Sequence, residues 1–319
     1  MPDNNAYLDL DAALGNEYFI NRELGQGAGF SVFSGTSKHD GSHVEIKTVP
    51  LEAFGTERAP SDAEMARRRI QHPTIVPILR AGSYAGSFYW ISPAIEGRTL
   101  RTRLSRGGRV DVKDALIILR DASAALTHAH LHGVVHGGLT PDSILISGGS
   151  ALVSDIGIPE VFAGLRSARS VEKRMATPAG SEPLRYSAPE QMKQGRSDAR
   201  SDVYAWGVIA YELLGGRHPF AGRATPREVM AAHTMEEPSP LTIPGSDPPL
   251  EVSRLVMRCL SKDPSERPET AREVFDLMTK AMLAPPPAPP PGRGQKIIIG
   301  LGVVFLIGLI VAIWTGFNP

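Results

Sequence analysis

One lysine and one aspartate in this sequence have the surroundings of residues that handle phosphate and metal ions. Lys47 ends the strand-like segment VEIK, and the earlier segment LGQGAGF places glycines at 25, 27 and 29. Glycine lets backbone N–H groups come close to phosphate oxygens, and a lysine adds a point charge. Asp155 follows the strand-like segment ALVS, where its carboxylate is a plausible Mg²⁺ ligand. Alone, the glycines are equally consistent with a plain hairpin turn.

Three further segments follow along the chain. They read YSAPE at 186–190, SDVYAWG at 201–207 and DPSERP at 263–268. Each is weak alone, but their order and spacing after the residues above are highly specific. On these motifs the chain from about 18 to 282 resembles a eukaryotic-type Ser/Thr protein kinase domain of the bacterial membrane-bound kind. The resemblance covers essentially the whole globular region.

This resemblance implies a nucleotide site, with ATP and Mg²⁺ as its cofactors. Lys47 looks like the third-strand lysine, Asp155 like the metal-binding aspartate and Ser92 like the gatekeeper. Pro93 lacks only an N–H, and its hinge position needs a carbonyl, so the hinge remains usable. The implied nucleotide-binding residues are Gly25, Gly27, Val32, Lys47, Pro93 and Ile95.

A second group of residues would hold the fold together by the same resemblance. Arg267 would pair with Glu190, and Asp202 would hold the backbone of the catalytic loop from a buried helix. Glu64 is the best candidate partner for Lys47, although it lies one residue closer to the following HP dipeptide than is usual. The implied structural residues are Glu64, His136, Glu190, Asp202 and Arg267.

The segment HGGLTPDS at 136–143 departs from the family's H-R-D-L-K-P-x-N at four polar positions. The replacements are Gly137 for the arginine, Gly138 for the catalytic aspartate, Thr140 for the lysine and Ser143 for the second metal ligand, asparagine. No catalytic residue is intact. A positioned base contributes roughly 10²–10⁴-fold, and phosphoryl transfer depends on charge neutralisation. We therefore expect low or absent activity.

Two nearby residues bear on the same question. Gly29 and Phe30 stand where the family has Phe and Gly, which would put a bulky ring over the phosphates. Asp142 is a weak substitute for the missing base, because it comes four residues after Gly138 at a position that usually faces solvent.

The leading hypothesis is a pseudokinase, because Lys47, Asp155 and the fold-holding residues are kept while the transfer residues are lost together. It would act as a nucleotide-binding scaffold or allosteric regulator in signalling, with a protein partner such as an active kinase or its substrates. Two alternatives stay open. One is a weakly active or unconventional Ser/Thr kinase. The other is a nucleotide-free interaction domain in which Phe30 closes the cleft.

The C-terminal end predicts a membrane anchor. Residues 297–317 are uncharged and apolar, and this length suits a helix across a bilayer. Arg293 and Lys296 precede the segment and place the kinase-like domain in the cytoplasm. The proline-rich residues 284–296 favour an extended linker. We expect a single-pass, tail-anchored membrane protein.

Composition excludes other classes. The chain has 319 residues, 34 basic and 34 acidic, so it lacks the positive charge of a nucleic-acid binder. Its single cysteine, Cys259, allows no intrachain disulfide. The histidines at 128, 130 and 132 cannot converge on one helix face, so we expect no structural metal.

These residues require a two-lobed α+β scaffold. We expect a polar extension at 1–16, a strand-rich small lobe at 17–96 and a helix-rich large lobe at 97–283. The small lobe should contain a hairpin bend at Asp40-Gly41 and a helix over 61–70, with Ser61 and Glu64 as its capping box. In the large lobe, helices are predicted from Asp111 to Gly133, over 201–216 and between 249 and 282, with two short strands in SILIS and ALVSD.

Overall fold

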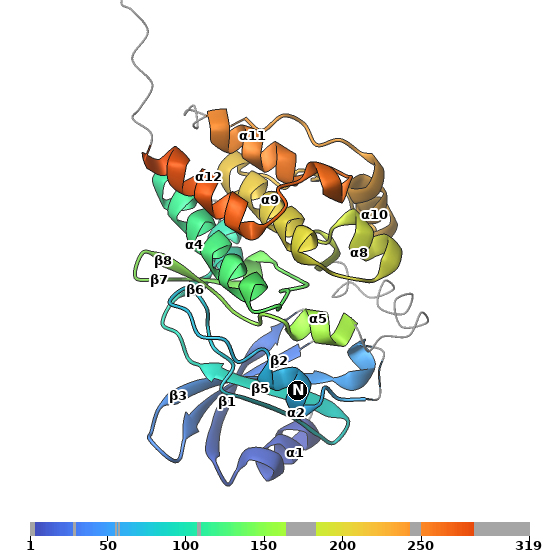
Figure 1. Cartoon of the computed structure of the whole chain (residues 1–319). Coiled ribbons are helices and arrows are strands. Elements are labelled where there is room, and N and C mark those ends of the chain that lie inside the picture. The colour runs from blue at the N-terminus through green and yellow to red at the C-terminus, as the bar shows by residue number, and fades with distance from the viewer. Residues whose placement is uncertain are drawn as a thin grey trace, which may run out of the picture. The chain divides into compact units, whose positions relative to one another are not determined.

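The computed structural model describes residues 4–27, 30–54, 56, 58–106, 110–163, 183–242 and 250–283. The chain divides into two compact units, Met1–Met282 and Leu283–Pro319. The first unit has a small sheet-rich lobe, which includes the blue strands of Figure 1, and a large helix-rich lobe. This is the two-lobed α+β architecture that the motifs predict.

A five-stranded antiparallel sheet forms the small lobe, in the order β1-β2-β3-β5-β4. Its strands are β1 (Tyr18–Gly27), β2 (Phe30–Ser37), β3 (His43–Pro50), β4 (Arg80–Tyr84) and β5 (Ser87–Pro93). Between β2 and β3, Oδ1 of Asp40 accepts a hydrogen bond from the N–H of Ser42 at 3.1 Å, and Gly41 has φ +73°. The predicted hairpin is confirmed. The β3–β5 register places Lys47 opposite Trp90.

The N-terminal residues belong to the small lobe, which corrects the prediction of a polar extension at 1–16. Helix α1 (Asn4–Leu14) buries Leu10 and Leu14 completely or nearly so. Their four-residue spacing puts both side chains on one face of the helix. The buried cluster that they join also contains Ile20, Phe33, Val44, Ile46, Tyr89 and Ile91.

Helix α2 is shorter than the helix predicted over 61–70. It spans Asp62–Ala66, and its N-terminal capping box forms as expected. The chain then turns, and the guanidinium of Arg68 donates to the carbonyl oxygens of Glu64 and Gly157. The helix therefore ends where Arg68 contacts a distant segment. The local sequence could not predict this contact.

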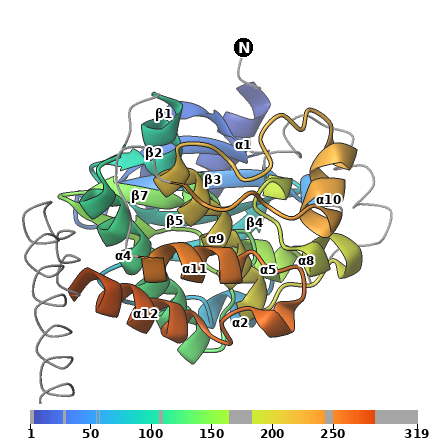
Figure 2. The same cartoon turned by 90° about the horizontal axis from the view of Figure 1, so that it is seen from above.

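Two buried helices form the centre of the large lobe and lie side by side in Figures 1 and 2. They are α4 (Val112–Leu131) and α9 (Ala199–Gly215). Asp111 caps α4 as predicted, through a hydrogen bond that its side chain accepts from a backbone N–H. The indole Nε1 of Trp206 on α9 donates to the carbonyl oxygen of Leu119 on α4 at 2.9 Å.

Shorter elements surround this pair, and α11 packs against α9 (Figure 2). The helices are α3 (Leu100–Ser105), α5 (Ile158–Ala163), α8 (Pro189–Gln194), α10 (Pro226–Met235), α11 (Leu250–Cys259) and α12 (Ala271–Leu283). A second sheet has the strands β6 (Arg98–Thr99), β7 (Ile144–Ser147) and β8 (Ser150–Val153). Helical turns of the 3-10 type lie at Leu51–Phe54, Pro141–Ser143 and Pro264–Glu266. Helix α5 follows β8 and lies between the two lobes in Figure 1.

The predicted linker at 284–296 and the predicted membrane span at 297–317 lie outside the described residues. Among the helices that the structure does describe, none combines the length and the hydropathy needed to cross a bilayer. The anchor stays a prediction.

Candidate active site

Lys47 and Asp155 form a direct ion pair between the lobes. Nζ of Lys47, on β3, lies 2.7 Å from Oδ2 of Asp155, which follows β8, and 3.4 Å from Oε1 of Glu45. Burial lowers the pKa of Lys47, but the two carboxylates outweigh it and hold that pKa above the ordinary value. Burial raises the pKa of Asp155, but the charge of Lys47 and the hydrogen bonds from Lys47, Trp90 and Ser154 outweigh it and hold that pKa below the ordinary value. Both groups are therefore charged at neutral pH.

Two further donors occupy the carboxylate of Asp155. The indole Nε1 of Trp90 donates to Oδ1 at 2.7 Å, and Oγ of Ser154 donates to Oδ2 at 2.9 Å. A carboxylate offers about four lone-pair directions, and with Lys47 three of them are used. The backbone of Asp155 is also in the left-handed region, at φ +61°. Both directions of Oδ2 and one of Oδ1 are therefore used, so a Mg²⁺ ion bound through both oxygens would have to displace at least one donor.

Phe30 and Trp90 cover the lysine from within the small lobe. Their rings meet edge to face, with centroids 6.2 Å apart. Nζ of Lys47 lies 5.8 Å from the centroid of the Phe30 ring. Phe30 packs against the buried cluster that contains Trp90. An aromatic ring therefore lies beside the lysine that the family resemblance assigns to phosphate.

The other predicted nucleotide-binding residues lie at three places in the small lobe. Gly25 lies at a register shift between β1 and β2, and the tip of the glycine loop is outside the described residues. Val32 on β2 is opposite Lys47 on β3. Pro93 is the last residue of β5, and Ile95 follows two residues later. Their predicted role in holding a nucleotide stays a prediction.

Glu64 does not pair with Lys47, so that expectation is wrong for this conformation. Its Oε2 instead accepts hydrogen bonds from N–H and Oγ of Ser61, at 2.7 and 2.6 Å. Arg58 adds an ion pair at 3.2 Å. The hydrogen bonds from Ser61 hold the pKa of Glu64 below its ordinary value. The capping box uses the carboxylate that was expected to reach the lysine.

Asp202 on α9 holds the backbone of the catalytic loop in the way the resemblance implies. Its Oδ2 accepts the N–H of His136 at 2.8 Å, and its Oδ1 accepts the N–H of Gly137 at 2.9 Å. Nε2 of His130 also lies 2.8 Å from Oδ2. Asp202 and His136 are both buried. These contacts need only the backbone at 137, so they survive the loss of the arginine.

Two polar residues at the end of the loop, Asp142 and Ser143, make other contacts. Oγ of Ser143 donates to the carbonyl oxygen of Thr140 at 2.9 Å and accepts the N–H of the same residue at 3.2 Å. Asp142 pairs with Arg101 on α3, with Nε and Oδ2 3.2 Å apart. Neither the proposed second-ligand position nor the candidate substitute base is free in this conformation.

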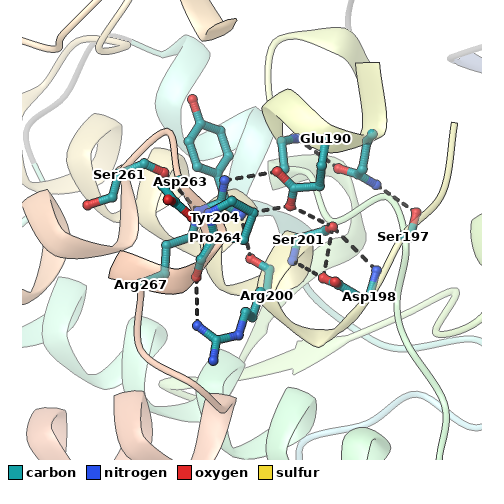
Figure 3. A network of polar contacts seen from close by, with 12 residues as sticks. Glu190, Ser197, Asp198, Arg200, Ser201, Tyr204, Ser261, Asp263, Pro264 and Arg267 are labelled. Carbon is teal, nitrogen blue, oxygen red and sulfur yellow. Dashed lines mark hydrogen bonds and ion pairs between the residues drawn. The ribbon is translucent and has the colours of Figure 1, made fainter. Parts of the chain in front are cut away.

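The large lobe contains a second, intact polar site, shown in Figure 3. Nη1 and Nη2 of Arg267 contact Oε1 and Oε2 of Glu190 at 2.7 and 2.9 Å, which is the ion pair expected from the motifs. Oγ of Ser201 donates to Oε1 of Glu190 at 2.9 Å. Arg267 is 1% exposed and lies against the ring of Tyr204, 4.8 Å from its centroid.

Arg267 also ties two backbone segments together through three carbonyl oxygens. Its guanidinium donates to the carbonyl oxygens of Ser261 at 2.8 Å, Lys262 at 3.1 Å and Arg200 at 3.1 Å. These bonds and the bidentate pair with Glu190 use every N–H direction of the planar fork. A residue saturated in this way stabilises the fold and takes no part in chemistry.

The histidines do not form a metal site. Nε2 of His130 contacts Asp202, while the ring of His128 packs between the rings of His72 and His132, at 4.6 and 4.4 Å between centroids. The stack joins i and i+4 on α4 to a residue of another segment, which spacing alone did not show. Within the described parts of the chain, no group of three histidine, cysteine or acidic residues could hold a metal ion.

Sequence reasoning missed Trp90 and helix α5. Trp90 lies two residues before Ser92 on the same strand, so the period of two puts both side chains on one face. That spacing was an available signal. The segment IPEVFA has no sequence pattern that predicts the packing of α5 against both lobes.

Comparisons of the sequence with known proteins bear on the family of this chain. The chain matches the protein kinase domain model over residues 18–277. It is 32% identical over 226 residues to serine/threonine-protein kinase PknB of Mycobacterium leprae, which covers 69% of this chain and 35% of that protein. It is 29% identical over 312 residues to serine/threonine-protein kinase pkn2 of Myxococcus xanthus, which covers 91% and 36%. The chain spans about a third of the length of these relatives. It belongs to the protein kinase domain family and is similar to bacterial Ser/Thr kinases within it.

Proposed function

We propose that this chain is a pseudokinase, a kinase domain that acts by binding another protein and transfers phosphate poorly or not at all. The observation that carries the proposal is the catalytic loop, where Gly137 and Gly138 replace the arginine and the base. Two polar groups later in the same loop, Asp142 and Ser143, are held by Arg101 and by their own turn. Asp142 and Ser143 are therefore engaged in this conformation, and His136 is fully buried, so none of the three is a positioned base.

The occupied carboxylate of Asp155 favours the nucleotide-free form of this function. The family uses ATP with Mg²⁺, which the metal-binding aspartate and the lysine help to hold. Here Lys47, Trp90 and Ser154 use that carboxylate. A nucleotide bound through these two side chains would compete with the Lys47–Asp155 pair. Weak nucleotide binding therefore remains the competing form, with the same deficient loop.

We also propose that the domain is tethered to a membrane and works in signalling. The uncharged segment 297–317 and the preceding basic residues support a C-terminal anchor, with the domain in the cytoplasm. A protein partner such as an active kinase or its substrate fits a kept fold with a deficient loop. Removing 296–319 should release the chain from the membrane fraction, and a truncated chain that still sediments with membranes would contradict the anchor.

Melting of the full-length chain in detergent, with and without millimolar Mg·ATP, separates the two forms. A ligand that binds only the native state raises the melting temperature by mass action. The nucleotide-free form predicts no shift, and the nucleotide-binding form predicts a shift that Asp155→Ala abolishes. Phosphate transfer to the chain itself or to a generic substrate, if lost in Asp155→Ala, would overturn the pseudokinase proposal.

A further inference from the structure

Helix α5 lies directly against the two glycines of the catalytic loop. A β-carbon built on Gly138 would lie 2.8 Å from Cβ and 2.9 Å from Cγ of Pro159. One built on Gly137 would lie 2.9 Å from the backbone nitrogen and 3.0 Å from Cα of Glu160. Such separations are well inside van der Waals contact for carbon, where packed atoms lie about 3.5–4.0 Å apart. Any side chain at 137 or 138 would displace α5.

The other side of α5 is fixed by Arg68, which follows α2. Its Nε donates to the carbonyl oxygen of Gly157 at 2.9 Å, and its Nη2 contacts Oε2 of Glu160 at 2.9 Å. The side chain of Arg68 is 11% exposed, so these bonds are largely shielded from water. A β-carbon on Gly157, at φ +78°, would lie 2.7 Å from Cγ of Arg68. The approach of this arginine therefore also depends on a glycine.

The apolar face of α5 extends the small-lobe core. Ile158, Val161 and Phe162 are buried in the same cluster as Phe88 and Trp90 of β5. The rings of Phe88 and Phe162 meet edge to face, with centroids 5.3 Å apart. Helix α5 thus contacts the small lobe through its apolar face and the large lobe through Pro159 and Glu160.

We propose that Gly137 and Gly138 form a seat for α5, and that the seated helix locks the small lobe and the catalytic loop in the conformation where Lys47 pairs with Asp155. The glycines are then packing residues of the present fold as well as marks of lost chemistry. The inference rests on the same loop as the proposed function, but it concerns packing, so stability and exchange measurements test it independently of phosphate transfer.

Replacement of Gly138 tests the seat without backbone strain, because its φ lies outside the positive region that disfavours other residues. Gly138→Ala should lower the melting temperature of the full-length chain by about 3–8 °C, since overpacking a filled site is destabilising. Pro159→Gly removes both atoms that the new methyl group meets. In the Pro159→Gly background, Gly138→Ala should therefore cost less than half of that shift.

A matched control replaces a proline in the first turn of another large-lobe helix, Pro226→Gly in α10. Both proline variants lose the same kind of restraint, but only Pro159 touches Gly138. The cost of Gly138→Ala should be unchanged by Pro226→Gly. Equal costs of Gly138→Ala in the wild-type and Pro159→Gly backgrounds would overturn the proposal.

Hydrogen exchange gives a second readout, because α5 could open while the rest of the domain stays folded. Gly138→Ala should raise amide exchange across 158–163 by about tenfold or more. Exchange in the buried helix α9 should stay unchanged. If Gly138→Ala alters neither the melting temperature nor the exchange of α5, the glycines are not a seat.

Discussion

Two polar sites of the domain differ in whether the contacts expected from the motifs form. In the large lobe, Glu190 pairs with Arg267, and Asp202 bonds the backbone of the catalytic loop, which are the partners expected from the motifs. Ser201 adds a hydrogen bond to Glu190, and we call Glu190, Ser201 and Arg267 the large-lobe network. The interlobe site comprises Lys47, Asp155, Gly137 and Gly138. There the lysine takes the aspartate as its partner in place of the helix glutamate, and α5 covers the glycines.

The difference separates residues that hold the fold from residues that perform chemistry. A buried ion pair such as Glu190–Arg267 cannot lose one member without leaving a charge unpaired in the interior. A catalytic base contributes little to stability, so its loss leaves the fold intact and frees the space for packing. On the proposed function, the interlobe site is a structural contact, whereas the large-lobe ion pair keeps the role that the motifs assign to it.

The largest expected effect concerns the large-lobe network. Arg267→Met should lower the free energy of unfolding by about 3–5 kcal/mol, because it leaves the largely buried Glu190 carboxylate without its charged partner. Chemical denaturation of the full-length chain measures this loss. Arg258→Met is the matched control, since the Arg258–Glu273 pair is solvent-exposed and should change stability by less than about 1 kcal/mol. Equal losses in the two variants would mean that the buried pair contributes no more to stability than the exposed pair.

Acid should also destabilise the large lobe. Burial lowers the pKa of His218 to about 4 and that of His233 to about 2, and their rings lie 5.9 Å apart. Nδ1 of His218 accepts the N–H of Phe220 and its Nε2 contacts the carbonyl of Arg185, so the neutral ring fits its site. Arg185 and Arg101 add positive charge nearby.

The sign of the effect follows from these values. Between the unfolded pKa of about 6.5 and the folded value of about 4, the unfolded chain binds more protons at His218. Stability should be full above about pH 6.5 and fall toward pH 4, by at most about 3 kcal/mol for this residue. Denaturation midpoints at pH 7, 6 and 5 measure the slope. A slope that His218→Asn leaves unchanged would contradict the assignment.

The indole hydrogen bonds of two tryptophans provide the finest test of the comparison. Trp90→Phe removes the donor to the Asp155 carboxylate and should cost about 1.5–3 kcal/mol. It should also make the domain more responsive to Mg·ATP, because one carboxylate oxygen is freed. Trp206→Phe removes a bond to a neutral carbonyl and should cost less, with no change in response to nucleotide. If Mg·ATP shifts the melting temperature equally in both variants, the Trp90 hydrogen bond does not limit access to the Asp155 carboxylate.

The same contrast explains what could be predicted from the sequence. Asp202, Glu190 and Arg267 were placed correctly because their partners lie within the motifs that identify them. Helices α4 and α9 followed from apolar periodicity and capping residues. The N-terminal helix was missed, although the spacing of Leu10 and Leu14 was visible.

The contacts of the interlobe site could not be predicted because its side chains have more than one possible partner, and the sequence does not show which one they take. Glu64 satisfies both a capping box and the position of a lysine partner, and only the folded chain shows which contact forms. The helical segment after Asp155 is contacted by Arg68 and packs into the cluster that contains Phe88 and Trp90 of β5. No local pattern encodes contacts between segments about 90 residues apart.

Turnover of phosphate transfer by the full-length chain, measured at millimolar Mg·ATP, tests the central claim most directly. Kinases turn over at about 1–100 s⁻¹. With the base and the second metal ligand absent, we expect transfer at least about 10⁴-fold slower, with no further loss in Asp155→Ala. Turnover inside the kinase range that disappears in Asp155→Ala would contradict the account and identify the chain as an active kinase.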